Sequence, residues 1–182
     1  MRVLVVDGFE PGEGSAVVDP ICDLLDGSGH TVTRSELAAE GFDRFMSADE
    51  RSAYHSDAPL ILPETQGAAD AVGRADGLVL CYRLVHGTCP PRVKSWQERV
   101  FVLGVGFRFT PSGRITGALD QLRRACVVAV ADQPDRLAGR RNGQGRCLAR
   151  SFHLSSNRRC RSSYLMVGPG DDGQVERVLR RW

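Results

Sequence analysis

The chain has 182 residues but only one lysine, Lys94, so arginine carries almost all of its positive charge. Its net charge of +2 at pH 7 is small for this length and argues against a general role in binding polyanions. No apolar run approaches the roughly 18 residues that a membrane-spanning helix needs. The composition therefore predicts neither a nucleic-acid partner nor a membrane partner.

Metal-binding patterns are also missing from the sequence. None of the six cysteines belongs to a C-x-x-C pair, and none stands at zinc-finger spacing from a histidine. Cys22, Cys81 and Cys126 lie within apolar runs and are interpreted as core residues. The first residues, Met-Arg followed by an apolar run, are unlike a signal peptide. We expect no metal site and a reducing, cytoplasmic compartment.

Hydrophobic content of 42% and charged content of 25% are typical of a soluble globular protein. The length suits one domain, residues 1–182, with a core of its own. Apolar runs at 2–7, 77–82 and 124–131 predict strands buried on both faces, because they are continuous rather than alternating. Segments 30–37 and 162–167 complete a set of five strands.

Helical segments separate these strands, which predicts a parallel sheet with helices on both faces. The expected helices cover residues 18–25, 64–75, 90–99 and 171–182. The stretch 133–161 is expected to be the least ordered part of the chain. Its eight arginines are interpreted as a solvated basic face or a mobile loop, and a site for an anionic substrate or a carrier protein is the alternative.

Residues 38–63 form an acidic excursion that carries aromatic side chains. Ser47 is the expected N-cap of a short helix that runs through Tyr54. Together with Phe42, Phe45 and Met46, Tyr54 gives the excursion more apolar surface than a solvated loop needs, which indicates a self-complementary patch.

Ligands of an open parallel sheet bind beyond the carboxyl ends of its strands, at a switch in strand order. Three loops must build any site there: 8–15, 83–90 and 132–139. His86 lies in the second loop and is a candidate for proton transfer near neutral pH, although an exposed histidine without a role is equally compatible with the sequence. Asp7 and Asp132 end strands of the sheet and are expected either to form a carboxylate pair with His86 or simply to cap their loops.

The same edge offers further candidate residues. Tyr82 and Arg83 are expected to orient an anionic or phenolic substrate, unless Arg83 pairs with Asp132 instead. Cys89 precedes Pro90 at a helix start, where a thiol pKa is lowered. It is a candidate nucleophile or, more simply, a partly buried cysteine.

Segments 38–55 and 94–109 resemble the flavodoxin-like NAD(P)H:quinone oxidoreductases, a family that holds FMN. Several residues match the family's segment around the second loop: Leu84, Gly87, Pro90, Lys94, Trp96, Arg99, Val100 and Phe101. The resemblance implies a three-layer flavodoxin-like fold with five parallel strands in the order 2-1-3-4-5. It also implies FMN at the three loops, NAD(P)H as reductant, a quinone-like acceptor and a symmetric homodimer.

Carried over residue by residue, the resemblance assigns FMN contacts to Ser15, Leu84, Val85 and Gly87 and leaves the substrate to Arg83, Phe9 and Cys89. The loops depart from the family pattern. Phe9 replaces a histidine, Arg83 a proline, and Val85 and His86 two tryptophans. Residues 132–136 contain no glycine. Four carboxylates lie in or beside the first loop and would repel a phosphate unless they turn away: Asp7, Glu10, Glu13 and Asp19.

Two functions follow from these observations. The first is the FMN- and NAD(P)H-dependent reduction of a quinone-like or aromatic molecule. The second is flavin-free acid/base chemistry in the vacated cleft, such as dehydration, cyclisation or isomerisation of a small aromatic or polyketide-like metabolite by Asp7, His86 and Asp132. A non-catalytic binding protein is a third reading. The altered loops predict weak or absent FMN binding.

Overall fold

Five parallel strands form the centre of the protein in the computed structural model, which describes residues 1–54, 56, 58–133, 143–157 and 159–182. The sheet has the order β2-β1-β3-β6-β7, with these bounds: β2 Thr31–Glu36, β1 Arg2–Asp7, β3 Gly77–Arg83, β6 Arg124–Val130 and β7 Arg161–Val167. Because β6 and β7 are the fourth and fifth strands of this sheet, the predicted order 2-1-3-4-5 is confirmed. His55, the third loop beyond Gln133 and half of the arginines of 133–161 lie outside the described residues.

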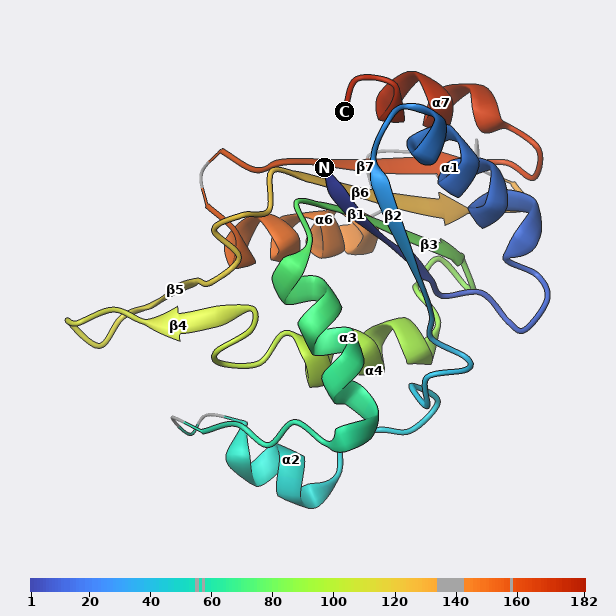
Figure 1. The fold of residues 1–182 in the computed structure, drawn as a ribbon. Helices are drawn as coiled ribbons and strands as arrows, with labels where there is room; N and C mark the ends of the chain where they lie inside the picture. Colours follow the sequence, from blue (N-terminus) through green and yellow to red (C-terminus); the bar gives the residue numbers. More distant parts are fainter. Residues whose placement is uncertain (55, 57, 134–142, 158) are drawn as a thin grey trace.

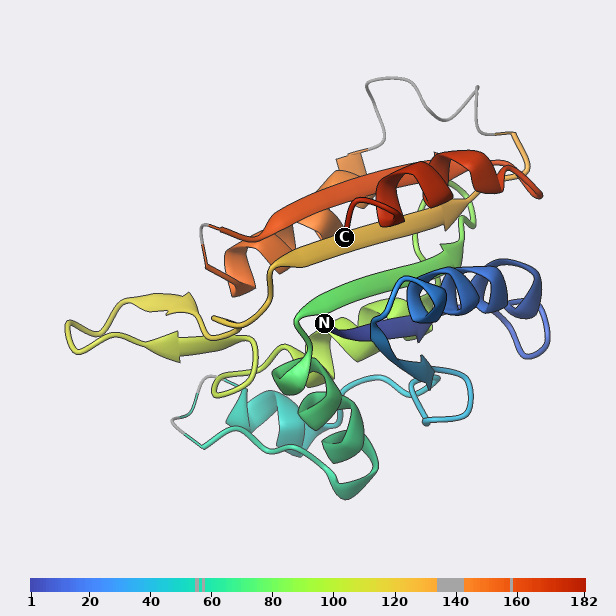
Figure 2. The same cartoon turned by 45° about the horizontal axis from the view of Figure 1, so that its top comes forward.

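Helices cover both faces of the sheet (Figures 1 and 2). Helices α1 (Ser15–Gly27) and α7 (Asp172–Leu179) pack on one face, and α3 (Pro63–Arg74), α4 (Pro91–Val100) and α6 (Gly143–Ser155) pack on the other. Successive side chains of a strand point to opposite faces. Val3 and Val5 accordingly join the core under α1, whereas Leu4 and Val6 join the core under α3 and α4. This double burial is why the strands read as continuous apolar runs.

Helix α6 occupies residues 143–155 of the stretch 133–161, where the sequence had predicted no helix. Leu148, Ala149 and Phe152 are buried in the core on one side of the helix, and the centre of the Phe152 ring lies 6.3 Å from that of Trp96. Exposed arginines such as Arg146 and Arg150 fill the other side of the helix. The arginine-rich composition therefore hid an amphipathic helix.

A two-stranded hairpin was also absent from the expected elements. Strands β4 (Phe107–Phe109) and β5 (Ile115–Gly117) pair antiparallel and project away from the sheet (Figure 1). Each strand has only three residues, too short for a sequence pattern to stand out.

The excursion contains the predicted short helix, α2 (Ala48–Ala53). Its N-cap Ser47 accepts a hydrogen bond from the Glu50 N–H at 3.1 Å, and the Glu50 carboxylate accepts one from the Ser47 N–H at 2.8 Å. This reciprocal capping box fixes the start of the helix. Phe42, expected on an exposed patch, is instead fully buried, while Phe45 is 86% exposed.

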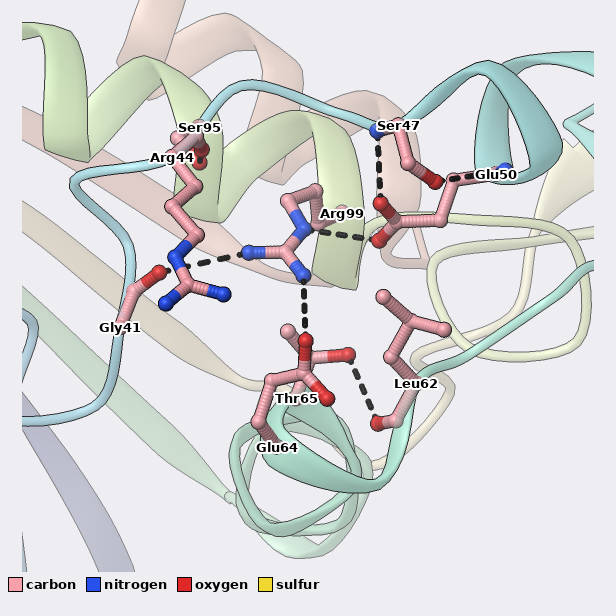
Figure 3. Close-up of polar contacts among 9 residues, drawn as sticks. All are labelled: Gly41, Arg44, Ser47, Glu50, Leu62, Glu64, Thr65, Ser95 and Arg99. Atoms are coloured by element: carbon pink, nitrogen blue, oxygen red, sulfur yellow. Dashed lines mark hydrogen bonds and ion pairs between the residues drawn. The ribbon is translucent and has the colours of Figure 1, made fainter.

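Arg99 of α4 ties the excursion to the core (Figure 3). Its guanidinium is 2% exposed and donates to Glu50 at 2.7 Å, to Glu64 at 3.4 Å and to the carbonyl of Gly41 at 3.4 Å. The cation also lies 5.7 Å from the centre of the Phe42 ring, within cation–π range. One side chain thus joins α2, α3 and α4.

Protonation of Glu50 would break this junction. Burial opposes the ionisation of Glu50, but hydrogen bonds from Ser47 and the charged Arg99 outweigh it and lower the pKa of the Glu50 carboxyl. A carboxyl with a lowered folded pKa contributes its full stability above the pKa of the unfolded chain and loses it as the pH falls through the folded value. The pair is therefore intact at neutral pH.

Glu50→Ala should lower the free energy of unfolding by about 3–5 kcal/mol, because it leaves the buried Arg99 cation without its close partner. Glu64→Ala is the matched control. It removes a carboxylate that is 47% exposed from the same guanidinium and should lower stability by less than about 1 kcal/mol. Urea denaturation measures both variants as shifts of the midpoint at unchanged slope. Equal losses would contradict a special role for the buried pair.

Candidate functional site

The carboxyl ends of β1, β3 and β6 lie at one edge of the sheet, where the strand order switches between β1 and β3. Asp7 ends β1 and Arg83 ends β3, while Asp132 follows β6 by two residues. The loops that leave these strands build the candidate site, as the switch-point rule predicts.

Each carboxylate of the first loop has an arginine partner. Arg34 of β2 binds Asp7 at 2.7 Å and Asp19 at 2.6 Å. Glu10 pairs with Arg92 at 2.8 Å, and Glu13 pairs with Arg83 at 3.4 Å. Three arginines from three different elements therefore neutralise the four acids that the sequence places in or beside this loop.

The Asp7 carboxylate lies against the start of α1. The helix begins at Ser15 after the N-cap Gly14, which makes no side-chain cap. A Cβ built on Gly14 would collide with both carboxylate oxygens of Asp7, so only glycine permits this approach. One oxygen accepts a hydrogen bond from the Phe9 N–H at 3.0 Å, and the other binds Arg34. A carboxylate of the chain thus occupies the positive end of its own helix.

Arg92 fixes the first loop from the other side. Its side chain, 8% exposed, donates to the carbonyl of Phe9 at 2.6 Å and to Asp43 of the excursion at 3.0 Å, in addition to Glu10. A charged group this deeply buried requires partners. The loop is consequently held between α4 and the excursion rather than left free to wrap a ligand.

Arg83 spans the edge between the first and third loops. Its guanidinium binds Glu13 at 3.4 Å and Asp132 at 2.8 Å and stays 38% exposed. The pairing with Asp132 was one of the two alternatives that the sequence left open for Arg83. Arg83 therefore contacts both loops while part of its side chain remains open to solvent.

The second loop is a tight two-residue turn. Val85 and Thr88 exchange both backbone hydrogen bonds at 3.0 Å, and the central residues His86 and Gly87 have φ angles of 51° and 75°. Two positive φ angles in succession are typical of a type I′ turn, in which glycine is favoured and histidine is uncommon. The turn presents exposed His86 and Val85 at its tip.

Within the described residues, no hydrogen bond or ion pair joins His86 to Asp7 or Asp132, whose carboxylates are taken by Arg34 and Arg83. The proposed constellation of His86 with a carboxylate stays a prediction. Of the residues assigned to FMN by resemblance, Ser15 is exposed on the first turn of α1, and Leu84 packs partly against the core.

Three of the predicted site residues have buried side chains. Tyr82 is fully buried between the sheet and the helices on the α4 side, and burial raises the pKa of its phenol. Phe9, at 3% exposure, packs with the core under α1, and Cys89 packs with the core under α4. All three side chains pack in core layers, and their assigned roles at the site stay predictions.

FMN, the cofactor that the family resemblance implies, does not fit the residues of the first loop. In a flavodoxin-like site the phosphate sits at the helix start, cradled by backbone N–H groups. Here the Asp7 carboxylate lies at that helix start, and Arg34 is already shared among Asp7, Asp19 and Glu36. A phosphate dianion would meet a like charge and find no unshared cation there.

Sequence reasoning missed Arg34 and Arg92, the two cations that organise this edge. The sequence did contain one indication of these cations, namely the four carboxylates in or beside the first loop. Acids in such a position need partners, and arginines are the cations that this chain supplies. Their identity depends on contacts 27 and 82 residues apart in the chain, which local patterns do not reveal.

The described part of the chain carries neither of two further features. No helix there is long and apolar enough to cross a membrane. No grouping of histidine, cysteine, aspartate and glutamate in the same residues is arranged to hold a metal ion.

A family model described as a flavodoxin-like fold matches residues 1–154. The solved NAD(P)H:quinone oxidoreductase from Methanothermobacter marburgensis is similar to this chain, with a TM-score of 0.77 and 20% identity over 100% of this chain and 96% of that chain. An azoreductase from Bacillus anthracis str. Sterne has a TM-score of 0.69 and 13% identity over the whole of both chains.

An FMN-dependent NADH-azoreductase from Bacillus anthracis str. Ames Ancestor, solved in complex with FMN, has a TM-score of 0.62 and 14% identity over 99% of this chain and 94% of that chain. At these identities the likeness shows a shared fold. No curated protein matches this chain in sequence.

Wild-type protein should bind FMN weakly or not at all, and Asp7→Ala should tighten FMN binding by at least about tenfold. The substitution removes a negative charge from the helix start and frees Arg34 for a phosphate, and tenfold corresponds to about 1.4 kcal/mol. Quenching of flavin fluorescence measures the affinity. Asp19→Ala is the control, since it also releases Arg34 but leaves the helix start filled. Stoichiometric submicromolar binding by the wild type would contradict this account.

Proposed function

This chain belongs to the flavodoxin-like fold family whose model matches residues 1–154, and from that membership we propose that it is an oxidoreductase acting on a small quinone-like or aromatic molecule. The supporting observation is the similarity of the entire chain to a solved NAD(P)H:quinone oxidoreductase, combined with a partly exposed cation, Arg83, at the edge of the sheet. We assign the substrate to this edge.

The reaction needs one hydride and one proton for each quinone reduced to a hydroquinone. NAD(P)H, the reductant that the resemblance implies, would supply the hydride and leave as NAD(P)⁺. Arg83 is suited to bind the carbonyl oxygen on which negative charge develops, because its guanidinium is a fixed donor between two loops. His86, exposed on the adjacent turn, is the candidate to deliver the proton.

Flavin-free acid/base chemistry is the second candidate function, and one observation favours it. The Asp7 carboxylate fills the place of a cofactor phosphate and is balanced by Arg34. A small aromatic or polyketide-like molecule could then bind at the same edge for dehydration, cyclisation or isomerisation. His86 would again transfer the proton.

We further propose a homodimer. An apolar groove of about 250 Å³ joins Tyr54 of the excursion to the β4–β5 hairpin, where Phe109 and Ile115 are 42% and 63% exposed. A two-stranded hairpin is marginally stable in water unless another surface covers its apolar side. A second copy packed about a two-fold axis would cover this groove and meet the same groove on its partner.

Purified protein should oxidise NADH or NADPH when a soluble benzoquinone or naphthoquinone is supplied, as followed at the absorbance of the reduced nicotinamide. His86→Gln should lower turnover by roughly 10²–10⁴-fold at unchanged fold, because it removes the proton donor. His30→Gln, at the opposite end of the sheet beside the N-terminus, is the control and should retain turnover.

The outcomes separate the two functions. Absence of nicotinamide oxidation with every quinone, with or without added FMN, would remove the oxidoreductase proposal. Wild-type turnover in His86→Gln would remove the histidine from the mechanism.

Light scattering at micromolar concentration should give the mass of a dimer, and Ile115→Glu should shift it to a monomer by placing a charge in the covered groove. Leu154→Glu is the control, because Leu154 is 59% exposed on α6 and lies outside the groove. A wild-type monomer, or dissociation by both variants alike, would contradict the assignment.

A further inference from the structure

A second pocket lies at the amino ends of β6 and β7, the edge opposite to the proposed active site. It has a volume of about 260 Å³ and is lined by three arginines, two serines and an indole: Arg124, Arg161, Ser162, Ser163, Arg181 and Trp182. Helix α7 runs back along the sheet from the carboxyl end of β7, and the C-terminal residues that follow it extend toward the amino ends of the strands (Figure 2).

The arginines converge because of strand register. Arg124 of β6 and Arg161 of β7 are direct partners in the parallel ladder, so their side chains leave the same face of the sheet. Cys126 stands two residues further along β6 and packs in the core under α1 and α7, which places Arg124 on the α7 side. Arg181 joins them from the end of α7, where its carbonyl accepts a hydrogen bond from Arg124 at 3.4 Å.

None of these three arginines has a carboxylate partner among the described residues. The acids nearby are engaged elsewhere, since Asp76 pairs with Arg2 at 3.1 Å and Glu176 pairs with Arg180 at 2.5 Å. Like charges directly opposite each other in a sheet are destabilising. The contrast is with the carboxyl edge, where every acid of the first loop has a close arginine partner.

A helix C-terminus attracts cations, and this accounts for Arg181 and for the bond between Arg124 and the carbonyl of Arg181. It does not account for Arg161, which belongs to a neighbouring strand. Arg123 and Arg159 are close in sequence to the lining residues Arg124 and Arg161, and they also lack carboxylate partners among the described residues. The carbonyl of Arg123 accepts a hydrogen bond from the N–H of Arg161 at 3.0 Å. The charge is therefore a local cluster that exceeds what the helix end requires.

One wall of the pocket is already fixed. A Cβ built on Gly77 would lie 2.9 Å from Cζ3 of Trp182, so the indole rests directly on the backbone of β3. The remaining polar groups, guanidinium forks and serine hydroxyls, can all donate hydrogen bonds. A pocket with a fixed indole wall and several hydrogen-bond donors is suited to bind a compact oxyanion.

We propose that this pocket binds the phosphate group of a small phosphorylated molecule. A phosphate monoester carries a charge of about −1.5 to −2 at pH 7, which three guanidinium groups can match with bidentate hydrogen bonds. Arg161, the last arginine of the stretch 133–161, thereby gains a role that a solvated basic face does not give it. The site is independent of the proposed oxidoreductase function.

The test titrates the full-length protein with inorganic phosphate and with pyrophosphate at ionic strength held constant with KCl. Calorimetry gives the affinity, and tryptophan fluorescence reports the pocket, because the other tryptophan, Trp96, is fully buried. Saturable binding is expected. Arg161→Gln should weaken it at least about tenfold, and Arg161→Lys, which keeps the charge but loses the fork, should weaken it less.

Arg114→Gln is the matched control, since Arg114 is an exposed arginine of the β4–β5 hairpin and its loss changes the net charge equally. Its affinity for phosphate should equal that of the wild type. Equal weakening by Arg161→Gln and Arg114→Gln, no saturation in the wild type, or binding of a single-stranded oligonucleotide without competition by phosphate would each overturn the proposal. Quinone turnover in Arg161→Gln should stay unchanged, which separates this test from that of the proposed function.

Discussion

Burial of both faces of the sheet decides where this protein can do chemistry. With α1 and α7 on one face and α3, α4 and α6 on the other, side chains of the inner strands β1, β3 and β6 alternate between two core layers, and the accessible groups of these strands lie at their ends. Tyr82 falls inside a layer, whereas Arg83, one residue further, emerges at the edge. The same rule exposes Arg161 at the opposite edge, where β7 begins. Two consecutive residues of one strand, Tyr82 and Arg83, can therefore occupy a core position and a candidate site position.

The two edges of the sheet differ in how their charged side chains are paired. At the carboxyl edge, arginines from β2, β3 and α4 neutralise every acid of the first loop, so the loop is held by the chain itself. At the amino edge, three arginines share a pocket and make no ion pair among the described residues. The net charge of the whole chain is small, and it therefore reveals neither the ion pairs at one edge nor the cluster of arginines at the other. The positions of the charges are more informative than their sum, because two charges within about 4 Å of each other interact far more strongly than distant ones.

The sequence was informative wherever the controlling physics was local. Continuous apolar runs located the buried strands, the family resemblance supplied their order, and Ser47 was correctly identified as a helix cap because a capping box spans only four residues. The family predicted from residues 38–55 and 94–109 is confirmed at the level of the fold. Helix α6 was missed because arginines mask its apolar stripe, and the role of Phe42 was misjudged because its partner Arg99 lies in another helix. The ion pairs of the candidate site could not be predicted from local sequence patterns, because each joins residues of separate elements.

The residues that carry the family resemblance are mainly those that the fold buries. Trp96, Arg99 and Phe101 are nearly inaccessible, and Arg99 in addition organises the excursion. Such positions resist change because a cavity or an unpaired cation costs several kcal/mol. The carboxyl edge is less constrained by burial, and it is there that Arg83, Val85 and His86 depart from the family pattern. Resemblance therefore fixes the scaffold of this protein while saying little about its chemistry, which depends on how the altered edge balances its charges.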